Sequence, residues 1–373
     1  MSNYNQPILP PATIGILGGG QLGQMMALVA KEMGYKVGVL DPTEDAPAAQ
    51  VADFQIVADY DDLDAMKELA QKSDVITYEF ENVDQDAMQQ VNDMTYIPQP
   101  ISELTITSNR ITEKSFLKEI GAPVTEFAEV NSQADLMNAY RAIGTPAILK
   151  TAEGGYDGHG QFDINNEADM NSAANQLNSV QWIYEKKQSF VKEVSIMVGR
   201  DITGKVTVFP LSENIHKDHI LHTSIIPART AESVHTNAKD IATKIAQELD
   251  LMGVLGIEFF QMADGKLLVN ELAPRPHNSG HYSIEACSIS QFKAHILSIC
   301  NLKLPEVSLI NPAVMVNLLG DDLTNGRQEL FNHPNWNFHD YGKAAIKPQR
   351  KMGHITVVGS DIDQLLDEVN LFK

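Results

Sequence analysis

Two glutamates near the ends of neighbouring apolar runs are the best-placed candidates for chemistry in this chain. The runs are 254–260 and 267–270, and a turn at Gly265 joins them, so we predict a hairpin that brings Glu258 close to Glu271. Two acids held side by side in a half-buried sheet repel each other unless a cation lies between them. Carboxylate oxygens that bridge to a phosphate suit Mg²⁺. The pattern therefore predicts a magnesium site.

An arginine, a histidine and an amide follow the acids directly, as Arg275, His277 and Asn278 in the segment 270–281. These side chains would face the anion that attacks a metal-bound phosphate. The layout predicts a site that consumes ATP.

A lysine and a glycine-rich segment precede this region. Lys150 ends the apolar run 147–149, and four glycines lie within 154–160. Such a segment can fold its backbone N–H groups over a polyphosphate, and the lysine supplies a point charge. The spacing is not that of the Walker motif, and a simple glycine-rich hairpin is the alternative. Arg110 and Lys114, one helical turn apart, either add positive charge or solvate their helix.

Two further polar segments lie between the glycine-rich segment and the paired acids. The segment 185–188 ends a strand whose exposed backbone could pair with an adenine edge, and Glu193 could hold ribose hydroxyls; surface charge is the alternative. The segment 213–222 contains His216, His219 and His222, but its spacing fits no common zinc site.

The N-terminal region carries a glycine motif that permits two interpretations. The segment 18–23 matches G-x-G-x-x-G between a strand and a helix, and Asp41 lies where a dinucleotide ribose would be held. The same turn would hold any phosphate or carboxylate. Glu79 and Glu81 follow a later strand at the same sheet edge, either as ligand-binding groups or as part of a helix cap.

A local basic cluster in the C-terminal part of an acidic chain predicts an anion site, with a solvated turn as the alternative. Its members are Lys343, Lys347, Arg350, Lys351 and His354.

Strands alternating with helices over the first 100 or so residues predict a doubly wound parallel α/β sheet. The polar, β-prone segment 98–108 is interpreted as the exit from this domain. The pattern then becomes α+β, with helices expected over 231–249 and 282–300 and a last helix over 361–371.

Composition sets the class of protein. The chain has 373 residues, 43% of them hydrophobic, which predicts two or three domains. The net charge of −21 argues against nucleic acid or an anionic membrane as a partner. Cys287 and Cys300 lie in apolar patterns and are expected to be reduced. With no transmembrane run and no signal-peptide pattern, we predict a cytoplasmic protein.

The order of these motifs resembles the ATP-grasp superfamily. The segments Gly-Gly-Gly-Gln-Leu-Gly, Tyr-Glu-Phe-Glu-Asn, Gly-Gly-Tyr-Asp-Gly-His-Gly-Gln and Asn-Glu-Leu-Ala-Pro-Arg-Pro-His-Asn-Ser-Gly-His are similar to those of the 5-(carboxyamino)imidazole ribonucleotide synthases of purine biosynthesis. The resemblance runs from residue 14 to the C-terminal helix. It implies an N-terminal Rossmann-like domain over 1–110, a central ATP-grasp subdomain over 111–190, and a C-terminal subdomain over 191–373.

The resemblance also implies a role for each motif. Mg²⁺ would lie on Glu258 and Glu271. Residues implied in ATP binding are Arg110, Lys150, Gly155, Tyr156, Asp157, Gly158, His159, Gly160, Gln161, Glu185, Lys186, Lys187, Gln188, Glu193, His216, Asn270 and Glu271. Bicarbonate, and the carboxyphosphate made from it, would contact Arg275, His277 and Asn278. Residues implied in binding aminoimidazole ribonucleotide are Gln21, Leu22, Glu79, Glu81, Tyr156, Asp157, Lys347 and Arg350.

Within this scheme Arg275, Lys150 and Asp157 would be catalytic, with Asp157 orienting or deprotonating the amine of the ribonucleotide. A homodimer is typical of the family. Many relatives carry Arg or Lys where this chain has His159, and a histidine is only partly charged near neutral pH. Two alternative functions stay open: a formate-dependent glycinamide ribonucleotide transformylase of the same fold, and an NAD-dependent oxidoreductase. A non-catalytic ATP-binding sensor is disfavoured, because a sensor need not keep both metal acids and the lysine.

Overall fold

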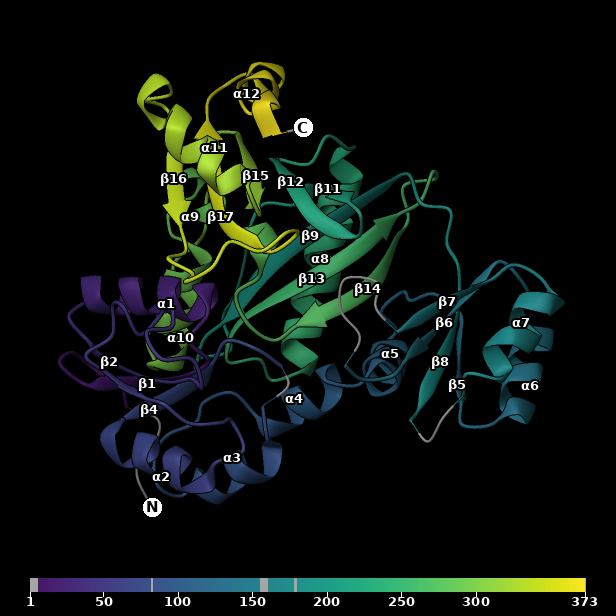
Figure 1. The fold of residues 1–373 in the computed structure, drawn as a ribbon, viewed down its shortest axis with the longest axis horizontal. Coiled ribbons are helices and arrows are strands. Elements are labelled where there is room, and N and C mark those ends of the chain that lie inside the picture. Colours follow the sequence, from purple (N-terminus) through teal and green to yellow (C-terminus); the bar gives the residue numbers. More distant parts are fainter. Residues whose placement is uncertain (1–5, 82, 155–159, 178–179, 373) are drawn as a thin grey trace.

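The computed structural model describes residues 6–81, 83–154, 160–177 and 180–372. Within them, the strands form three sheets, and Figure 1 shows a first domain at the lower left, a small lobe at the right and a large central sheet between them. The predicted glycine-rich segment falls largely outside the described residues. The predicted α/β and α+β class is confirmed.

The first domain is a parallel sheet in the order β3-β2-β1-β4, as the alternating pattern predicted. Its strands are buried apolar runs, which is typical of parallel sheets covered on both faces. The strands are β1 (Thr13–Leu17), β2 (Lys36–Leu40), β3 (Phe54–Ile56) and β4 (Val75–Tyr78). The helices are α1 (Gln21–Glu32), α2 (Leu63–Lys72), α3 (Gln85–Val91) and α4 (Ile101–Thr107).

Helix α4 corrects the β-prone interpretation of 98–108. Pro100 precedes its first helical residue, and Leu104 is fully buried in the core of the first domain. Proline is well tolerated at a helix start, and packing of one apolar face outweighs weak intrinsic helix propensity.

The small lobe is an antiparallel sheet in the order β5-β8-β6-β7. Its strands are β5 (Phe127–Val130), β6 (Ala147–Thr151), β7 (Gln161–Ile164) and β8 (Trp182–Lys186). Its helices are α5 (Arg110–Glu119), α6 (Gln133–Ile143) and α7 (Glu167–Ala174). Because β6 pairs with β7, the glycine-rich segment connects two adjacent strands of a hairpin.

The large sheet is antiparallel in the order β14-β13-β9-β11-β12-β15-β17-β16, with β10 paired to β9. Its strands are β9 (Lys192–Arg200), β10 (Val206–Val208), β11 (Ser212–Lys217), β12 (Ile220–Ile226), β13 (Gly253–Gln261), β14 (Leu267–Ala273), β15 (Ala313–Leu319), β16 (Asn337–Asp340) and β17 (Lys351–Val358). Its helices are α8 (Glu232–Glu248), α9 (Ser283–Ala286), α10 (Gln291–Ile299), α11 (Asp322–Glu329) and α12 (Ile362–Glu368). Single 3₁₀ turns are η1 (Asn278–Gly280), η2 (Leu330–Asn332) and η3 (Asn370–Phe372).

The helix expected over 282–300 is wrong as one element. Cys287 has extended backbone, and the Ser290 side chain accepts a hydrogen bond from the Lys293 N–H to begin a new helix. Serine favours this capping position because its hydroxyl satisfies a free helix-end amide. The expected last helix is likewise shorter, since α12 is followed by the separate turn η3. The histidine-containing segment 213–222 lies mostly in the β11–β12 hairpin.

Helix α10 joins the first domain to the large sheet. Phe292, Ile296 and Ile299 pack into the same hydrophobic cluster as α1 and β1. His295 accepts a hydrogen bond from the Val254 N–H at its Nδ1, so its Nε2–H donates to Thr77 Oγ1 at 2.8 Å. The carboxyl edge of the parallel sheet is thereby held beside the β13–β14 hairpin. Both cysteines are free and buried, and no described helix is long and apolar enough to span a bilayer.

Candidate active site

The two predicted metal acids are direct cross-strand partners. Glu258 on β13 pairs with Glu271 on β14, and the register shifts by one residue immediately afterwards, so that Phe259 pairs with Val269. Asn270 is therefore the extra residue of a β-bulge, where strand alternation breaks and side chains are re-aimed. Asn270 and Glu271 are accordingly both half-buried, whereas an uninterrupted strand would send them to opposite faces.

The surroundings of the hairpin disfavour a second negative charge. Burial, and then the nearby Glu271, raise the pKa of Glu258 to about 7. Burial also raises the pKa of Glu113 to about 8, and its carboxylate accepts a hydrogen bond from the Leu272 N–H. A hard divalent cation between Glu258 and Glu271 would relieve this repulsion, so the donor set fits Mg²⁺.

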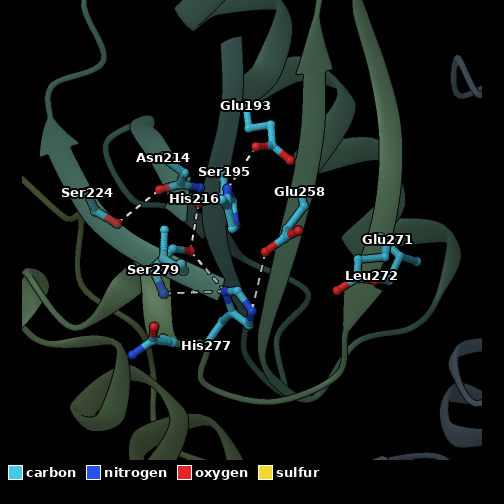
Figure 2. A network of polar contacts seen from close by, with 12 residues as sticks. Glu193, Ser195, Asn214, His216, Ser224, Glu258, Glu271, Leu272, His277 and Ser279 are labelled. Atoms are coloured by element: carbon cyan, nitrogen blue, oxygen red, sulfur yellow. Dashed lines mark hydrogen bonds and ion pairs between the residues drawn. The ribbon is translucent and has the colours of Figure 1, made fainter. Parts of the chain in front are cut away.

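The Arg275–His277 segment contacts Glu258 on one side and Glu81 of the first domain on the other. The Arg275 guanidinium contacts the Glu81 carboxylate at 2.8 Å. Burial alone would raise the pKa of Glu81, but this arginine lowers it. His277 Nε2 lies 3.5 Å from Glu258 Oε1, as Figure 2 shows. Gly256 permits this approach, because a Cβ there would lie 2.7 Å from the His277 Cβ. Burial, then Arg275, lowers the pKa of His277 well below its usual value.

Asn278 lies in the same loop and is paired with Asn317 on β15. Its amide exchanges two hydrogen bonds with the Asn317 amide, at 3.0 and 2.6 Å, and the residue is buried. Both ends of the side chain are therefore engaged, and the geometry gives it the position of a loop anchor.

Residues predicted to bind ATP take part in an ion-pair cluster around Glu185. Lys150 Nζ lies 3.1 Å and Lys114 Nζ 3.7 Å from its carboxylate. Burial alone would raise the pKa of Glu185, but these two lysines lower it. Lys114 also donates to the Asn270 carbonyl at 3.0 Å, which ties α5 to the bulge. Arg110 lies 3.5 Å from Glu271.

The other predicted ATP residues line the strands around this cluster. Lys187 pairs with Asp163 at 2.9 Å, and Gln188 donates to Thr125 at 2.6 Å. Glu193 and His216 form an ion pair of 2.8 Å. Despite the opposing effect of burial, Glu193 raises the pKa of His216. Lys186 ends β8, and Gln161 begins β7 directly after Gly160.

The glycine turn of the first domain is filled by carboxylates of the chain itself. Glu79 accepts hydrogen bonds from the Gly20 N–H at 2.5 Å and the Gly23 N–H at 2.6 Å. A Cβ on Gly20 would lie 2.5 Å from the same carboxylate, so glycine is required there by close approach. Asp41 accepts from the Gly19 N–H at 2.7 Å and from Tyr60 at 2.6 Å. The amides that a dinucleotide pyrophosphate would use are therefore engaged, while Gln21 and Leu22 open α1 beside them.

Lys343 of the basic cluster lies near this turn, whereas His354 is fully buried and does not belong to a basic surface. Burial and then Arg350 lower the pKa of Lys343 to about 8, and Glu79 acts on the same lysine in the opposite direction. Lys347 and Arg350 are exposed and lie in the loop before β17. Gln50 Nε2 of the first domain donates to the Gly342 carbonyl at 2.9 Å. The loop before β17, which carries Lys347 and Arg350, and the glycine turn thus border one region from two sides.

Five predicted site residues lie outside the described part of the chain: Gly155, Tyr156, Asp157, Gly158 and His159. Sequence reasoning did not single out Glu113 or Ser195 as site residues. Ser195 is the register partner of Glu258 on β9 and is fully buried. A serine inside the apolar run 194–198 was the one signal that could have drawn attention to it.

Comparisons with known proteins agree with this geometry. Residues 11–107 match the ribonucleotide synthetase preATP-grasp domain, residues 115–292 the ATP-grasp domain, and residues 313–368 the phosphoribosylaminoimidazole carboxylase C-terminal domain. The fold and site thus define an ATP-grasp ligase.

Named relatives narrow the class further. The N5-carboxyaminoimidazole ribonucleotide synthase of Bacillus subtilis (strain 168) is 48% identical over 366 residues, 98% of this chain and 96% of the relative. The crystal structure of N5-carboxyaminoimidazole synthetase from Staphylococcus aureus complexed with ADP gives a TM-score of 0.94 at 45% identity, covering 100% of each chain. The Aspergillus clavatus synthase in complex with ADP and 5-aminoimidazole ribonucleotide gives 0.90 at 31% identity, covering 99% of this chain and 98% of that one. This chain belongs to the N5-carboxyaminoimidazole ribonucleotide synthase family.

Proposed function

We propose that this chain carboxylates the exocyclic amine of 5-aminoimidazole ribonucleotide with ATP and bicarbonate, giving N5-carboxyaminoimidazole ribonucleotide, ADP and phosphate. The observation that carries this proposal is the contact of His277 with Glu258 and of Arg275 with Glu81. These contacts bring the metal acids, two candidate anion-binding side chains and the carboxyl edge of the first domain to one place. Three reactants can meet there, as the reaction requires.

Glu258 and Glu271 would hold Mg²⁺, which supplies neutralisation of charge on the phosphates when it is bound. Arg110, already 3.5 Å from Glu271, and Lys150 would bind the nucleotide phosphates from the opposite side. The Glu185 carboxylate holds Lys150 in position. Glu193 and His216 would contact the ribose, and β8 with the following residues 187–188 would border the adenine.

Bicarbonate is a poor electrophile, so one of its oxygens would first attack the γ-phosphorus of ATP, and ADP would leave as carboxyphosphate forms. Arg275 is oriented by Glu81 at 2.8 Å and would bind the carboxylate oxygens of this intermediate. The intermediate hydrolyses readily, so closure of the glycine-rich segment over it would exclude water. Asp157, in that segment, is the proposed residue that orients or deprotonates the attacking amine.

The charges around the ribonucleotide region suggest how that substrate would be oriented. Glu79 occupies the amides of the glycine turn, so a phosphate there would meet a carboxylate. Lys347 and Arg350 offer positive charge on the opposite side. The phosphate of the ribonucleotide would therefore bind Lys347 and Arg350. Its ribose hydroxyls would face Glu79 and the start of α1, at Gln21 and Leu22.

The test is steady-state ADP release with Mg-ATP and bicarbonate, with and without aminoimidazole ribonucleotide. Parallel reactions would contain glycinamide ribonucleotide and formate, or NAD with candidate alcohol substrates. ADP release that requires the imidazole nucleotide and bicarbonate supports the proposal. Release only with formate would assign the transformylase reaction instead. The homodimer and the cytoplasmic location stay predictions, and light scattering of the purified protein tests the first.

A further inference from the structure

A chain of buried hydroxyl and amide side chains runs through the large sheet and ends at His277. Its members come from neighbouring strands and the η1 turn, and Figure 2 shows Ser195, Asn214, Ser224 and Ser279 to the left of Glu258. They are Ser195 on β9, Ser212 and Asn214 on β11, Ser224 on β12, and Ser279. All of them are at most 5% exposed. Buried polar side chains in proteins are in most cases hydrogen-bonded, as these are.

The hydrogen bonds of this chain have a direction. Asn214 Nδ2, which can only donate, lies 2.8 Å from Ser195 Oγ. Ser195 Oγ donates to Ser279 Oγ at 2.6 Å. Ser279 Oγ lies 2.9 Å from His277 Nδ1 and can donate to it when Nδ1 carries no hydrogen. The far end is held by Ser224, which donates to Asn214 Oδ1 at 2.9 Å.

A second contact also makes His277 Nδ1 a hydrogen-bond acceptor. The Ser279 backbone N–H, which can only donate, points to Nδ1 at 3.4 Å. In a neutral imidazole, a nitrogen that accepts leaves the proton on the other nitrogen. Nε2 would then carry the hydrogen and present it toward Glu258 Oε1 at 3.5 Å. The opposite tautomer would place a lone pair against the ionised form of that carboxylate.

We propose that the Asn214–Ser195–Ser279 chain holds His277 as the Nε2–H tautomer, so that His277 acts as a hydrogen-bond donor to the bicarbonate-derived anion and not as a base. The bicarbonate part of this inference rests on the proposed function. Asn214, Ser195 and Ser279 are positioning residues, because they act through His277. The tautomer is a property of the protein alone and can be measured without magnesium or substrate.

The direct test is a long-range ¹H–¹⁵N correlation spectrum of the metal-free protein, labelled with ¹⁵N-histidine. The His277 signals are assigned from the peaks that disappear in the His277→Gln variant. Two distinct nitrogens with the hydrogen on Nε2 are the expected result. A hydrogen on Nδ1 in the wild-type protein overturns the proposal, whatever the activity.

Variants connect the tautomer to bicarbonate. Ser279→Ala should raise the bicarbonate KM about tenfold, the order expected for loss of one hydrogen bond, and change the ATP KM by less than about twofold. Ser195→Ala, one link further away, should have a smaller effect of the same kind. The matched control is Ser298→Ala, since Ser298 is also fully buried and hydrogen-bonded but lies outside this chain of residues.

The outcomes separate this inference from the proposed function. Equal changes in both KM values, or equal effects in Ser298→Ala, would show a merely structural role and overturn the positioning assignment. An Nε2–H tautomer in a protein whose ADP release ignores bicarbonate would overturn both the proposed reaction and the anion contact of His277. Bicarbonate-dependent turnover with an Nδ1–H tautomer would overturn this inference alone.

Discussion

The glycine turn of the first domain and the β13–β14 hairpin each bring two carboxylates together, and their surroundings differ. At the turn, Asp41 and Glu79 accept hydrogen bonds from four backbone N–H groups, three of them from glycines of the turn. At the hairpin, Glu258 is the cross-strand partner of Glu271; Glu258 contacts His277 and Glu271 contacts Arg110, each at 3.5 Å. Carboxylates supplied with amides organise the backbone, whereas carboxylates facing each other bind a cation when one is present. Pairs of carboxylates thus differ in their expected role according to whether backbone N–H groups donate hydrogen bonds to them.

The largest expected effect comes from removing a charge at the hairpin. Glu271→Gln or Glu258→Gln should lower kcat by about 10³-fold, because a metal held by carboxylates supplies several kcal/mol of charge stabilisation. Glu258→Gln should also raise the melting temperature of the magnesium-free protein, since it removes the repulsion. Kinetics and thermal unfolding measure the two effects.

Asp264→Asn, in the exposed turn of the same hairpin, serves as the control for these variants. Near-normal kcat at saturating Mg²⁺ in either glutamate variant would contradict the metal assignment.

Removing the arginine between the two regions should have the next largest effect. Arg275→Ala should lower kcat/KM for bicarbonate by about 10²-fold, because a charge-assisted contact to the intermediate is lost. Bicarbonate-dependent ADP release measures it. Arg327→Ala removes another arginine–carboxylate pair, with Asp340, and should have little effect. Unchanged activity in Arg275→Ala would move the anion site elsewhere.

At the glycine turn, the main expected effect is on stability and ribonucleotide binding. Glu79→Gln places an amide NH₂ against one of two backbone N–H groups, which should cost about 2 kcal/mol of unfolding free energy. The ribonucleotide KM should rise, while the ATP KM should change by less than about twofold. Urea unfolding and steady-state kinetics measure these quantities. Glu68→Gln, in an exposed pair with Lys72, is the control; an equal loss of ATP affinity in Glu79→Gln would remove the distinction between the regions.

Proton binding at the hairpin should make magnesium affinity depend on pH. The pKa of Glu258 is raised to about 7 by burial and Glu271, so the folded, magnesium-free protein holds a proton that the unfolded chain loses near pH 4.5. The contribution of Glu258 to the free energy of unfolding therefore falls as the pH rises from about 4.5 to 7. Apparent Mg²⁺ affinity should rise by up to about tenfold per pH unit below 7 and level off above it.

The Mg²⁺-induced shift in melting temperature between pH 5.5 and 8 would measure this dependence. Glu113→Gln separates the contribution of the neighbouring carboxyl, whose pKa is raised to about 8. A flat profile in the wild-type protein would show that proton binding at Glu258 does not compete with the metal.

The smallest effect on catalysis is expected from Asp41. Asp41→Asn should leave the ATP KM and kcat within about threefold, because Asp41 contacts the protein's own Gly19 and Tyr60. Kinetics at saturating ribonucleotide measure this. A large loss in a well-folded variant would reopen the dinucleotide interpretation of the glycine motif.

Local pattern determined much of this protein. Apolar runs and turn residues were enough to predict the parallel first sheet and the hairpin that pairs Glu258 with Glu271, because strand periodicity and turn chemistry act over a few residues. The long and specific segment from Asn270 to His281 was also enough to indicate the family. The bounds of the expected domains and the roles of individual site residues stay predictions.

Only the tertiary structure decided which polar groups meet. The bulge at Asn270, the occupation of the glycine turn by Glu79 and the buried chain from Asn214 to His277 join residues far apart in sequence. The helical state of α4 depended on the packing of Leu104, which composition does not reveal, whereas the start of α10 has a local cause in the Ser290 cap. Sequence pattern reports which face of an element is apolar, whereas the partner of each buried polar atom depends on how separate elements are brought together.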